Sequence, residues 1–310
     1  MRRTMLAAAA LYGLGAAAAH ADDPAACRTL RLADIGWTDV AATTALTALL
    51  LRDLGYQPRT VALTIPGTYQ ALKSGEVDAF LGNWMPAMEQ DRKPFVEDKS
   101  IDVLGPNLSG ARYTLAVPQY LYDRGLHSFA DIHDFARELN FRIYGIEQGN
   151  DGNRHVLDLI RADRDGLGKF QLVESSEQGM LAQLDKDYRA HRAIVFLGWE
   201  PHPMNVLYKI AYLSGGDDTF GPDQGAASVY TNVRTAYAET CPNATKLLGN
   251  EAFTLQGEDE MMNLILTRRL DPAKAAAAWA KGHKDAIRPW LDGVTTLDGR
   301  PAAAAVLGKL

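Results

Sequence analysis

Two distant segments of the chain share one pattern, and this internal similarity constrains the fold more than any other feature of the sequence. Residues 77–88, VDAFLGNWMPAM, and residues 193–204, AIVFLGWEPHPM, each place an apolar run before a glycine, a tryptophan and a proline. A helical pattern, QALKSGE or LAQLDKD, precedes each run. Because the same unit occurs twice, the sequence predicts two similar lobes.

Short apolar runs alternate with helical patterns along most of the chain. Strands are predicted at 29–35, 60–63, 77–81, 113–118, 141–146, 170–174 and 193–197, and helices at 41–54, 68–73, 129–139, 154–161, 176–185, 261–270 and 272–283. Thr38 or Asp39 is expected to cap the first helix, and Gly82 is expected to end the third strand. This alternation predicts an α/β fold with a mainly parallel sheet covered by helices.

The first residues of the chain have the composition of a signal peptide. Arg2 and Arg3 precede an apolar run from Met5 to Ala19, and Ala19-His20-Ala21 is a small-x-small cleavage site. We predict that residues 1–21 are a signal peptide, cleaved after Ala21, and that the mature protein is soluble and periplasmic. The apolar run is shorter than a membrane-spanning helix requires.

Charge and motifs exclude several classes of protein. The formal net charge of -6 makes nucleic acid an unlikely partner. The sequence contains no G-x-S-x-G elbow, no H-E-x-x-H pair, no P-loop and no G-x-G-x-x-G motif. The histidines are scattered without the spacing of metal ligands. We therefore predict neither a metal nor a cofactor, and no enzymatic activity.

The sequence contains two cysteines, Cys27 and Cys241. In an oxidising compartment, one disulfide between them is the default interpretation, and two unpaired buried thiols are the alternative. A bond between them would place the start of the mature chain and the segment near residue 241 in the same lobe.

Three tryptophans lie where predicted strands end. Trp37, Trp84 and Trp199 each follow an apolar run, immediately after a glycine or within two residues of one. Ligands of open α/β sheets bind beyond the carboxyl ends of strands, so these rings are expected at a binding crevice. Trp279 and Trp290 lie in helical patterns and are expected to pack in the core.

Facing aromatic rings suit either sugars or cations. A quaternary ammonium ion donates no N–H hydrogen bond, so a site selects it with π faces, each contributing about 0.5–2 kcal/mol. Asp39, two residues after Trp37, has two possible roles. It can balance the charge of a cation, or it can cap the helix that begins there.

Seven segments resemble the choline-binding proteins of bacterial ABC importers, which belong to a wider family of betaine and choline solute receptors. They are DIGWTD, FLGNWMP, YTLAVP, YGIEQGNDGNR, SSEQGMLAQ, FLGWEPHPMN and LSGGDDTFGP, spread between about Leu30 and about Gly299. The resemblance implies a two-lobed type II periplasmic binding protein fold with two hinge crossings, near Arg112 and Leu213. It implies that lobe I comprises residues 22–111 and 214–310, and that lobe II comprises residues 112–213.

The resemblance also implies a ligand and its site. The ammonium group of choline is expected in an aromatic box, with Asp39 supplying negative charge and Asn150, together with Asp39, meeting the hydroxyl. The four rings of this box are Trp37, Trp84, Tyr113 and Trp199. The implied partners are the membrane permease and ATPase subunits of an ABC importer.

Two alternatives stay open from the sequence. Glycine betaine, carnitine or acetylcholine is the alternative ligand, and an exported choline-ester enzyme is the alternative function. Betaine and carnitine carry a carboxylate that Asp39 would repel. Donors that can compensate lie near the box residues in sequence, namely Arg112, Arg154 and His202.

Overall fold

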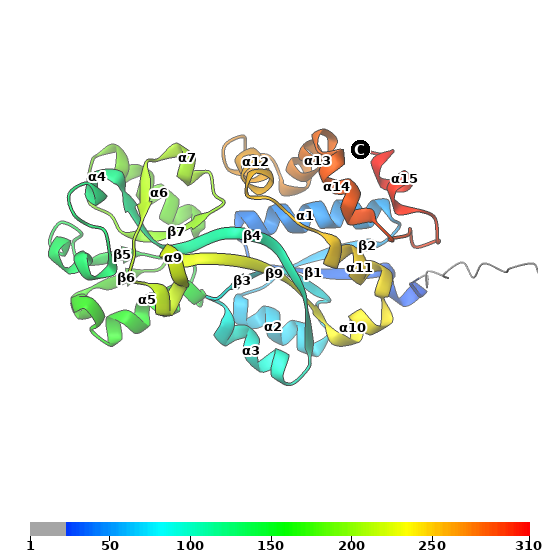
Figure 1. Ribbon diagram of the computed structural model, residues 1–310, viewed down its shortest axis with the longest axis horizontal. Coiled ribbons are helices and arrows are strands. Elements are labelled where there is room, and N and C mark those ends of the chain that lie inside the picture. The colour runs from blue at the N-terminus through cyan, green and yellow to red at the C-terminus, as the bar shows by residue number, and fades with distance from the viewer. Residues whose placement is uncertain (1–22) are drawn as a thin grey trace, which may run out of the picture.

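The computed structural model of the protein describes residues 23–310, so the predicted signal peptide lies outside the described residues. Within residues 23–310, nine strands form one continuous sheet with the order β2-β1-β3-β9-β4-β7-β5-β6, and β8 pairs with β4. Figure 1 shows two groups of elements at opposite ends of the molecule, joined by the long strands β4 and β9. We refer to these groups as the β1–β3 end and the β5–β7 end.

The β1–β3 end is built from the first part of the chain. It contains the strands β1 (Thr29–Asp34), β2 (Gln57–Ala62) and β3 (Ala79–Met85), and the helices α1 (Thr38–Asp53), α2 (Ile65–Ser74) and α3 (Glu89–Glu97). Strand β1 pairs in parallel with both β2 and β3. Helix α1 lies on one side of these strands, and α2 and α3 lie on the other (Figure 1). The sheet is therefore covered on both faces, as predicted.

The β5–β7 end repeats this arrangement with shorter strands. It contains α4 (Gln119–Tyr122), the 3-10 helix Phe129–Phe135, β5 (Arg142–Tyr144), α5 (Asp151–Arg161), the 3-10 helix Arg164–Lys169, β6 (Gln171–Val173), α6 (Glu177–Arg189), β7 (Phe196–Glu200), α7 (Met204–Leu207) and β8 (Ile210–Tyr212). Strand β5 pairs in parallel with β6 and β7. The predicted second pass of strands and helices is therefore present.

Two long antiparallel strands connect the ends. Strand β4 (Ile101–Pro118) extends from one end to the other, and β9 (Ala226–Arg234) returns beside it after the short helices α8 (Asp217–Phe220) and α9 (Pro222–Gly225). Arg112 is paired with Glu200 of β7 and with Ala226 of β9, so β4 changes its neighbour at this residue.

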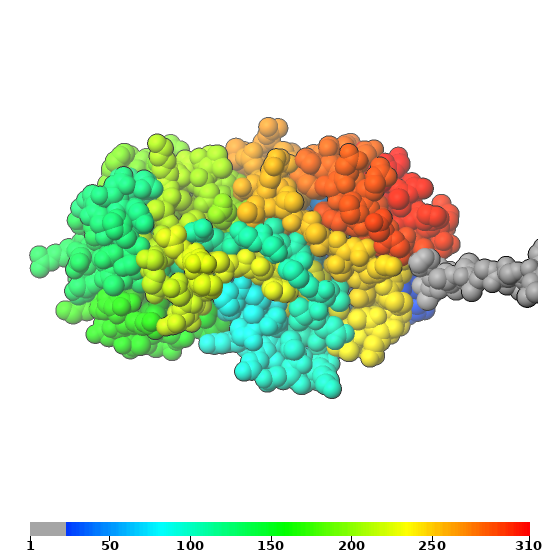
Figure 2. All heavy atoms as spheres, in the orientation of Figure 1, coloured from blue at the N-terminus to red at the C-terminus, as the bar shows by residue number. Residues whose placement is uncertain are grey.

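The C-terminal part of the chain returns to the β1–β3 end. Its helices are α10 (Thr235–Thr240), α11 (Pro242–Asn250), α12 (Leu255–Leu266), α13 (Pro272–Gly282), α14 (Lys284–Ile287) and α15 (Ala302–Leu307), with a 3-10 helix at Arg288–Leu291. In Figure 2 these yellow to red segments cover one end of the molecule, whereas the green middle of the chain forms the other end. Trp279 and Trp290 are buried there, which confirms that both pack in the core.

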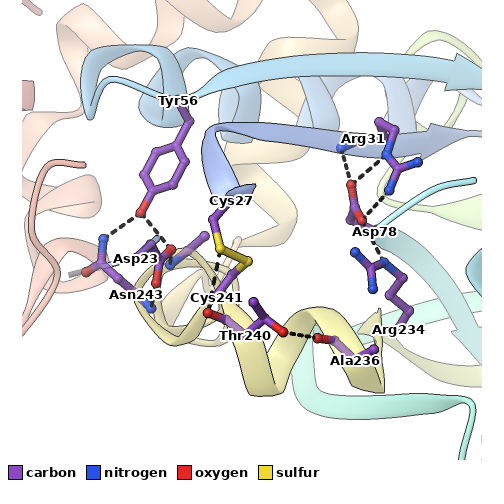
Figure 3. Close-up of a disulfide and its surroundings, with 11 residues drawn as sticks. Asp23, Cys27, Arg31, Tyr56, Asp78, Arg234, Ala236, Thr240, Cys241 and Asn243 are labelled. Carbon is purple, nitrogen blue, oxygen red and sulfur yellow. Dashed lines mark hydrogen bonds and ion pairs between the residues drawn. A yellow bond between two sulfur atoms is a disulfide. The ribbon is translucent and has the colours of Figure 1, made fainter. Parts of the chain in front are cut away.

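A disulfide joins Cys27 to Cys241, as predicted (Figure 3). It links the 3-10 helix Ala25–Arg28, which precedes β1, to the segment between α10 and α11. Asp23 strengthens the same junction, because its carboxylate accepts hydrogen bonds from the backbone N–H groups of Asn243 and Ala244 and from the Tyr56 hydroxyl. In the chain-entropy model, a disulfide that closes so long a loop adds about 5 kcal/mol to the free energy of unfolding.

Three local predictions are wrong in detail. Strand β3 does not end at Gly82 but continues to Met85. A Cβ atom at Gly82 would lie 2.5 Å from the Val40 side chain, so glycine serves here to let α1 approach the strand. Neither Thr38 nor Asp39 caps α1, because both are already helical and Trp37 occupies the N-cap position. The predicted helix at 129–139 is a shorter 3-10 helix that ends at Phe135.

Within residues 23–310, none of the helices combines the length and the apolar character that crossing a bilayer requires.

Candidate ligand-binding site

The first part of the candidate site lies where β1 turns into α1. Gly36 adopts a φ of 87°, a left-handed conformation that favours glycine, and Trp37 and Asp39 follow it. The Trp84 indole N–H donates a hydrogen bond of 3.0 Å to Asp39 Oδ2. The other oxygen, Asp39 Oδ1, is buried and has no hydrogen-bond partner among the described residues. One carboxylate oxygen therefore holds a ring, and the other is available to a ligand.

Tyr113 lies at the centre of the aromatic cluster. Its ring centroid is 6.4 Å from that of Trp37, 6.0 Å from that of Trp84 and 6.5 Å from that of Trp199. These pairs are tilted or edge to face, with interplanar angles from 54° to 83°. All four rings are at most 4% exposed. The four predicted aromatic residues thus come together in one enclosed cluster.

A hydrogen bond fixes the indole of Trp37, whereas within residues 23–310 the indole of Trp199 has none. The Trp37 N–H donates to Glu147 Oε1 at 2.8 Å, a contact between the β1–β3 end and the β5–β7 end. The N–H of Trp199 is buried and has no partner among the described residues. Most buried donors in native structures are hydrogen-bonded, so this N–H can still take an acceptor.

Asn150 connects the aromatic cluster to α5. Its Oδ1 accepts a hydrogen bond from the backbone N–H of Asn153, which caps the helix, and another from the Tyr113 hydroxyl at 3.1 Å. Its Nδ2 donates to Asp151 Oδ1 at 3.0 Å. The helix cap orients the amide, because Asn150 must present its oxygen to the backbone N–H. The amide also interacts with the carboxylate of Glu147.

The site is acidic. Burial, followed by the nearby carboxylate of Glu177, raises the pKa of Asp39 to about 7. Burial, followed by the charge of Asp91, raises the pKa of Asp151 to about 7 as well. Burial, followed by Asp39, raises the pKa of Glu258 well above its usual range. A cation bound here would offset the cost of burying these carboxylates.

The three candidate donors for a ligand carboxylate have other partners. Arg112 donates to Gln224 Oε1 and lies over the ring of Tyr212. Arg154 forms two hydrogen bonds with Asp91. His202 Nε2 donates to Glu177 Oε1 at 3.1 Å. Each of the three candidate donors therefore already makes at least one hydrogen bond within the protein.

Several residues of this site are not among those predicted from the sequence. Phe220 lies edge-on to Tyr113 with a centroid distance of 5.7 Å, and it also contacts Phe129 and His155. Glu147 and Glu177 contact the start of α1 from the β5–β7 end. Their segments, YGIEQGN, SSEQGM and DDTFGP, belong to the conspicuous motifs of the sequence, but the motifs do not indicate which side chain faces the cluster.

Comparison with known proteins shows the family to which the chain belongs. The family model for the substrate binding domain of ABC-type glycine betaine transport systems matches residues 28–282. The chain belongs to this family. Its fold is the two-lobed type II fold of periplasmic binding proteins, so the predicted fold class is confirmed.

Two solved structures of choline-binding receptors are similar over nearly the whole chain. An ABC-transporter choline binding protein in complex with choline is 50% identical, with a TM-score of 0.90 and coverage of 93% of this chain and 99% of that chain. The unliganded semi-closed conformation of such a protein is 51% identical, with a TM-score of 0.83 and coverage of 92% and 99%. The glycine betaine/carnitine transport binding protein GbuC of Listeria monocytogenes is 30% identical over 166 residues, 54% of each chain.

Membership of this family defines the kind of protein. These proteins are solute receptors that work with the permease and ATPase subunits of ABC importers, in the periplasm or outside the cell. The predictions of a transport receptor and of no enzymatic activity are confirmed.

Proposed function

We propose that the protein is a choline receptor, in which Trp37, Trp84, Tyr113 and Trp199 surround the quaternary ammonium group. The observation that carries this proposal is the enclosed ring cluster with a buried carboxylate whose Oδ1 atom lacks a partner among the described residues. Each ring face contributes about 0.5–2 kcal/mol, so four rings supply about 2–8 kcal/mol, compared with the roughly 8 kcal/mol of a micromolar complex.

Charge favours choline over a zwitterionic ligand. Asp39 balances the single positive charge of choline, whereas the carboxylate of glycine betaine or carnitine would meet buried acidic groups. Among the candidate donors, Arg112 already donates to Gln224, Arg154 to Asp91 and His202 to Glu177. Asn150 lies beside the Tyr113 hydroxyl, where its amide can meet the choline hydroxyl.

We propose that the box forms on closure of two lobes, with residues 22–111 and 214–310 in lobe I and residues 112–213 in lobe II. The change of strand partner at Arg112 supports a first crossing there, and the end of β8 at Tyr212 supports a second crossing near Leu213. Trp37 and Trp84 then come from lobe I, and Tyr113, Asn150 and Trp199 from lobe II. A ligand that contacts both halves stabilises the closed form.

We also propose a periplasmic location, with the signal peptide of residues 1–21 cleaved after Ala21. The sequence of that segment and the family membership support this proposal. Mass spectrometry of the protein isolated from the periplasmic fraction should find Asp22 as the first residue. A mature chain that retains Met1 contradicts it.

Calorimetry tests the ligand assignment directly. Choline, acetylcholine, glycine betaine and carnitine are titrated into the same preparation, and choline is expected to bind most tightly. Equal or tighter binding of glycine betaine contradicts the choline assignment but leaves the aromatic site in place. Time-dependent hydrolysis of acetylcholine in proportion to protein would instead favour the choline-ester enzyme.

A further inference from the structure

One buried carboxylate connects the two halves of the candidate site without belonging to the aromatic cluster. Glu177, the first residue of α6, is 1% exposed. Its Oε2 accepts the backbone N–H of Thr38 at 2.8 Å. Its Oε1 accepts the Thr38 hydroxyl at 2.6 Å and Nε2 of His202 at 3.1 Å. Thr38 belongs to the β1–β3 end, whereas Glu177 and His202 belong to the β5–β7 end.

Helix α1 lacks a cap of its own. The first N–H groups of a helix have no partner within it, and a side chain at the N-cap position usually satisfies one of them. The N-cap residue here is Trp37, which makes no such hydrogen bond. Glu177 supplies the missing acceptor from across the interface, and its negative charge also interacts favourably with the helix dipole. The residue it holds, Thr38, lies between the site residues Trp37 and Asp39.

The second contact of Glu177 leads to another ring of the site. The backbone N–H of Met204 donates to Nδ1 of His202, so that nitrogen is an acceptor and the ring proton lies on Nε2. Nε2 then donates to Glu177. The imidazole lies edge to face with Trp199, at a centroid distance of 4.8 Å and an angle of 72°. Glu177 is thereby linked to Trp199 through one side chain.

We propose that Glu177 is a positioning residue that aligns the start of α1 with Trp199 in the closed form and thereby slows release of the ligand. This inference rests on the proposed function. Glu177 contacts Thr38 and His202 rather than the rings of the box. When the lobes separate, Thr38 and Glu177 both exchange their mutual bonds for water, so this contact stabilises the closed form alone.

The test compares Glu177→Ala and Glu177→Gln with the unchanged protein. Alanine leaves the buried donors of Thr38 and His202 without an acceptor, which corresponds to about a ten- to hundred-fold rise in the choline dissociation constant. Glutamine keeps one oxygen as an acceptor but places an amide N–H where Thr38 or His202 donates. A smaller rise in the choline dissociation constant is therefore expected. Stopped-flow tryptophan fluorescence should assign most of the change to faster dissociation.

Two further variants separate positioning from folding. Thr38→Val removes the hydroxyl contact but keeps the backbone N–H, so it should raise the dissociation rate less than Glu177→Ala does. Glu76→Gln changes an exposed glutamate and should match the unchanged protein. The melting temperature of ligand-free Glu177→Gln should stay near that of the unchanged protein, while its increase on adding choline becomes smaller.

An unchanged dissociation rate in both Glu177 variants overturns the proposal, provided that the unchanged protein binds choline. So does a loss of ligand-free stability without faster dissociation, which is the result expected of a purely structural residue. If the unchanged protein does not bind choline, the proposed function fails instead. Small-angle scattering of ligand-free protein then decides about Glu177, because Glu177→Ala should be more open, and identical scattering curves contradict the proposal.

Discussion

Tyr113 and Trp199 are direct partners on the neighbouring antiparallel strands β4 and β7, and their rings meet edge to face with centroids 6.5 Å apart. Directly opposed residues of an antiparallel pair present their side chains on the same face of the sheet. The backbone ladder therefore holds this part of the aromatic cluster in place. A change of either ring should alter the site while leaving the strands paired.

Trp199→Ala should weaken choline binding by about five- to thirty-fold, corresponding to the loss of about 1–2 kcal/mol from one ring face. The Trp199 N–H has no partner among the described residues, so the substitution removes no hydrogen bond. Calorimetry measures the change. Trp279→Phe is the control, because Trp279 donates to Glu260 far from the cluster in sequence and should affect the melting temperature but not the affinity. Equal affinities for the Trp199→Ala variant and the unchanged protein contradict the aromatic box.

Asp39→Asn should lower the affinity for choline by about ten-fold or more, because it removes a desolvated charge next to the cation. Asparagine still offers an oxygen to the Trp84 N–H, so the ring should keep its orientation. The melting temperature of the ligand-free variant should not fall, since a fully buried carboxylate is costly to ionise. If stability falls and affinity does not, Asp39 is a structural residue.

Choline affinity should depend on pH through Asp39, whose pKa is raised to about 7 by burial and then by Glu177. The groups that face it are Glu177 from α6, Glu258 from α12 and the Trp84 N–H from β3. A bound cation favours the ionised carboxylate, so affinity should increase as the pH rises to about 7 and level off above it. Below that pH the dissociation constant should increase by up to about ten-fold per pH unit.

Asp151 is the control for this pH profile, because burial raises its pKa to about 7 as well. Calorimetric titrations across the pH range should show a flat profile for Asp39→Asn and a normal slope for Asp151→Asn. The reverse result would assign the titration to Asp151 and remove Asp39 from its role as the counter-charge.

Replacing both cysteines by serine should lower the free energy of unfolding by about 2–5 kcal/mol. The bond joins the 3-10 helix before β1 to the segment before α11, within the β1–β3 end. Choline affinity at a temperature below the transition should therefore be unchanged. Urea denaturation and calorimetry measure the two quantities separately. A large loss of affinity in folded protein contradicts this separation.

Local patterns in the sequence determined the strands, most helices and the positions of the rings. Trp37, Trp84 and Trp199 lie near strand ends because an apolar run followed by glycine is a local signal that a single sequence displays. Because the sequence contains only two cysteines, one disulfide pairing within the chain was possible. Asn150 was also readable, since a turn residue before a helical pattern predicts a cap, and its side chain does accept from Asn153.

The tertiary structure alone decided which polar groups meet. The sequence favoured Thr38 or Asp39 as the cap of α1, yet the cap is Glu177, which lies 139 residues away from Thr38. Phe220 approaches Tyr113 from the short helix α8, whose four residues are too few to show a periodicity. Such contacts depend on how segments that are distant in the sequence pack against each other. Periodicity reports only which face of an element is apolar, so the identity of a partner from the other half is set by packing in three dimensions.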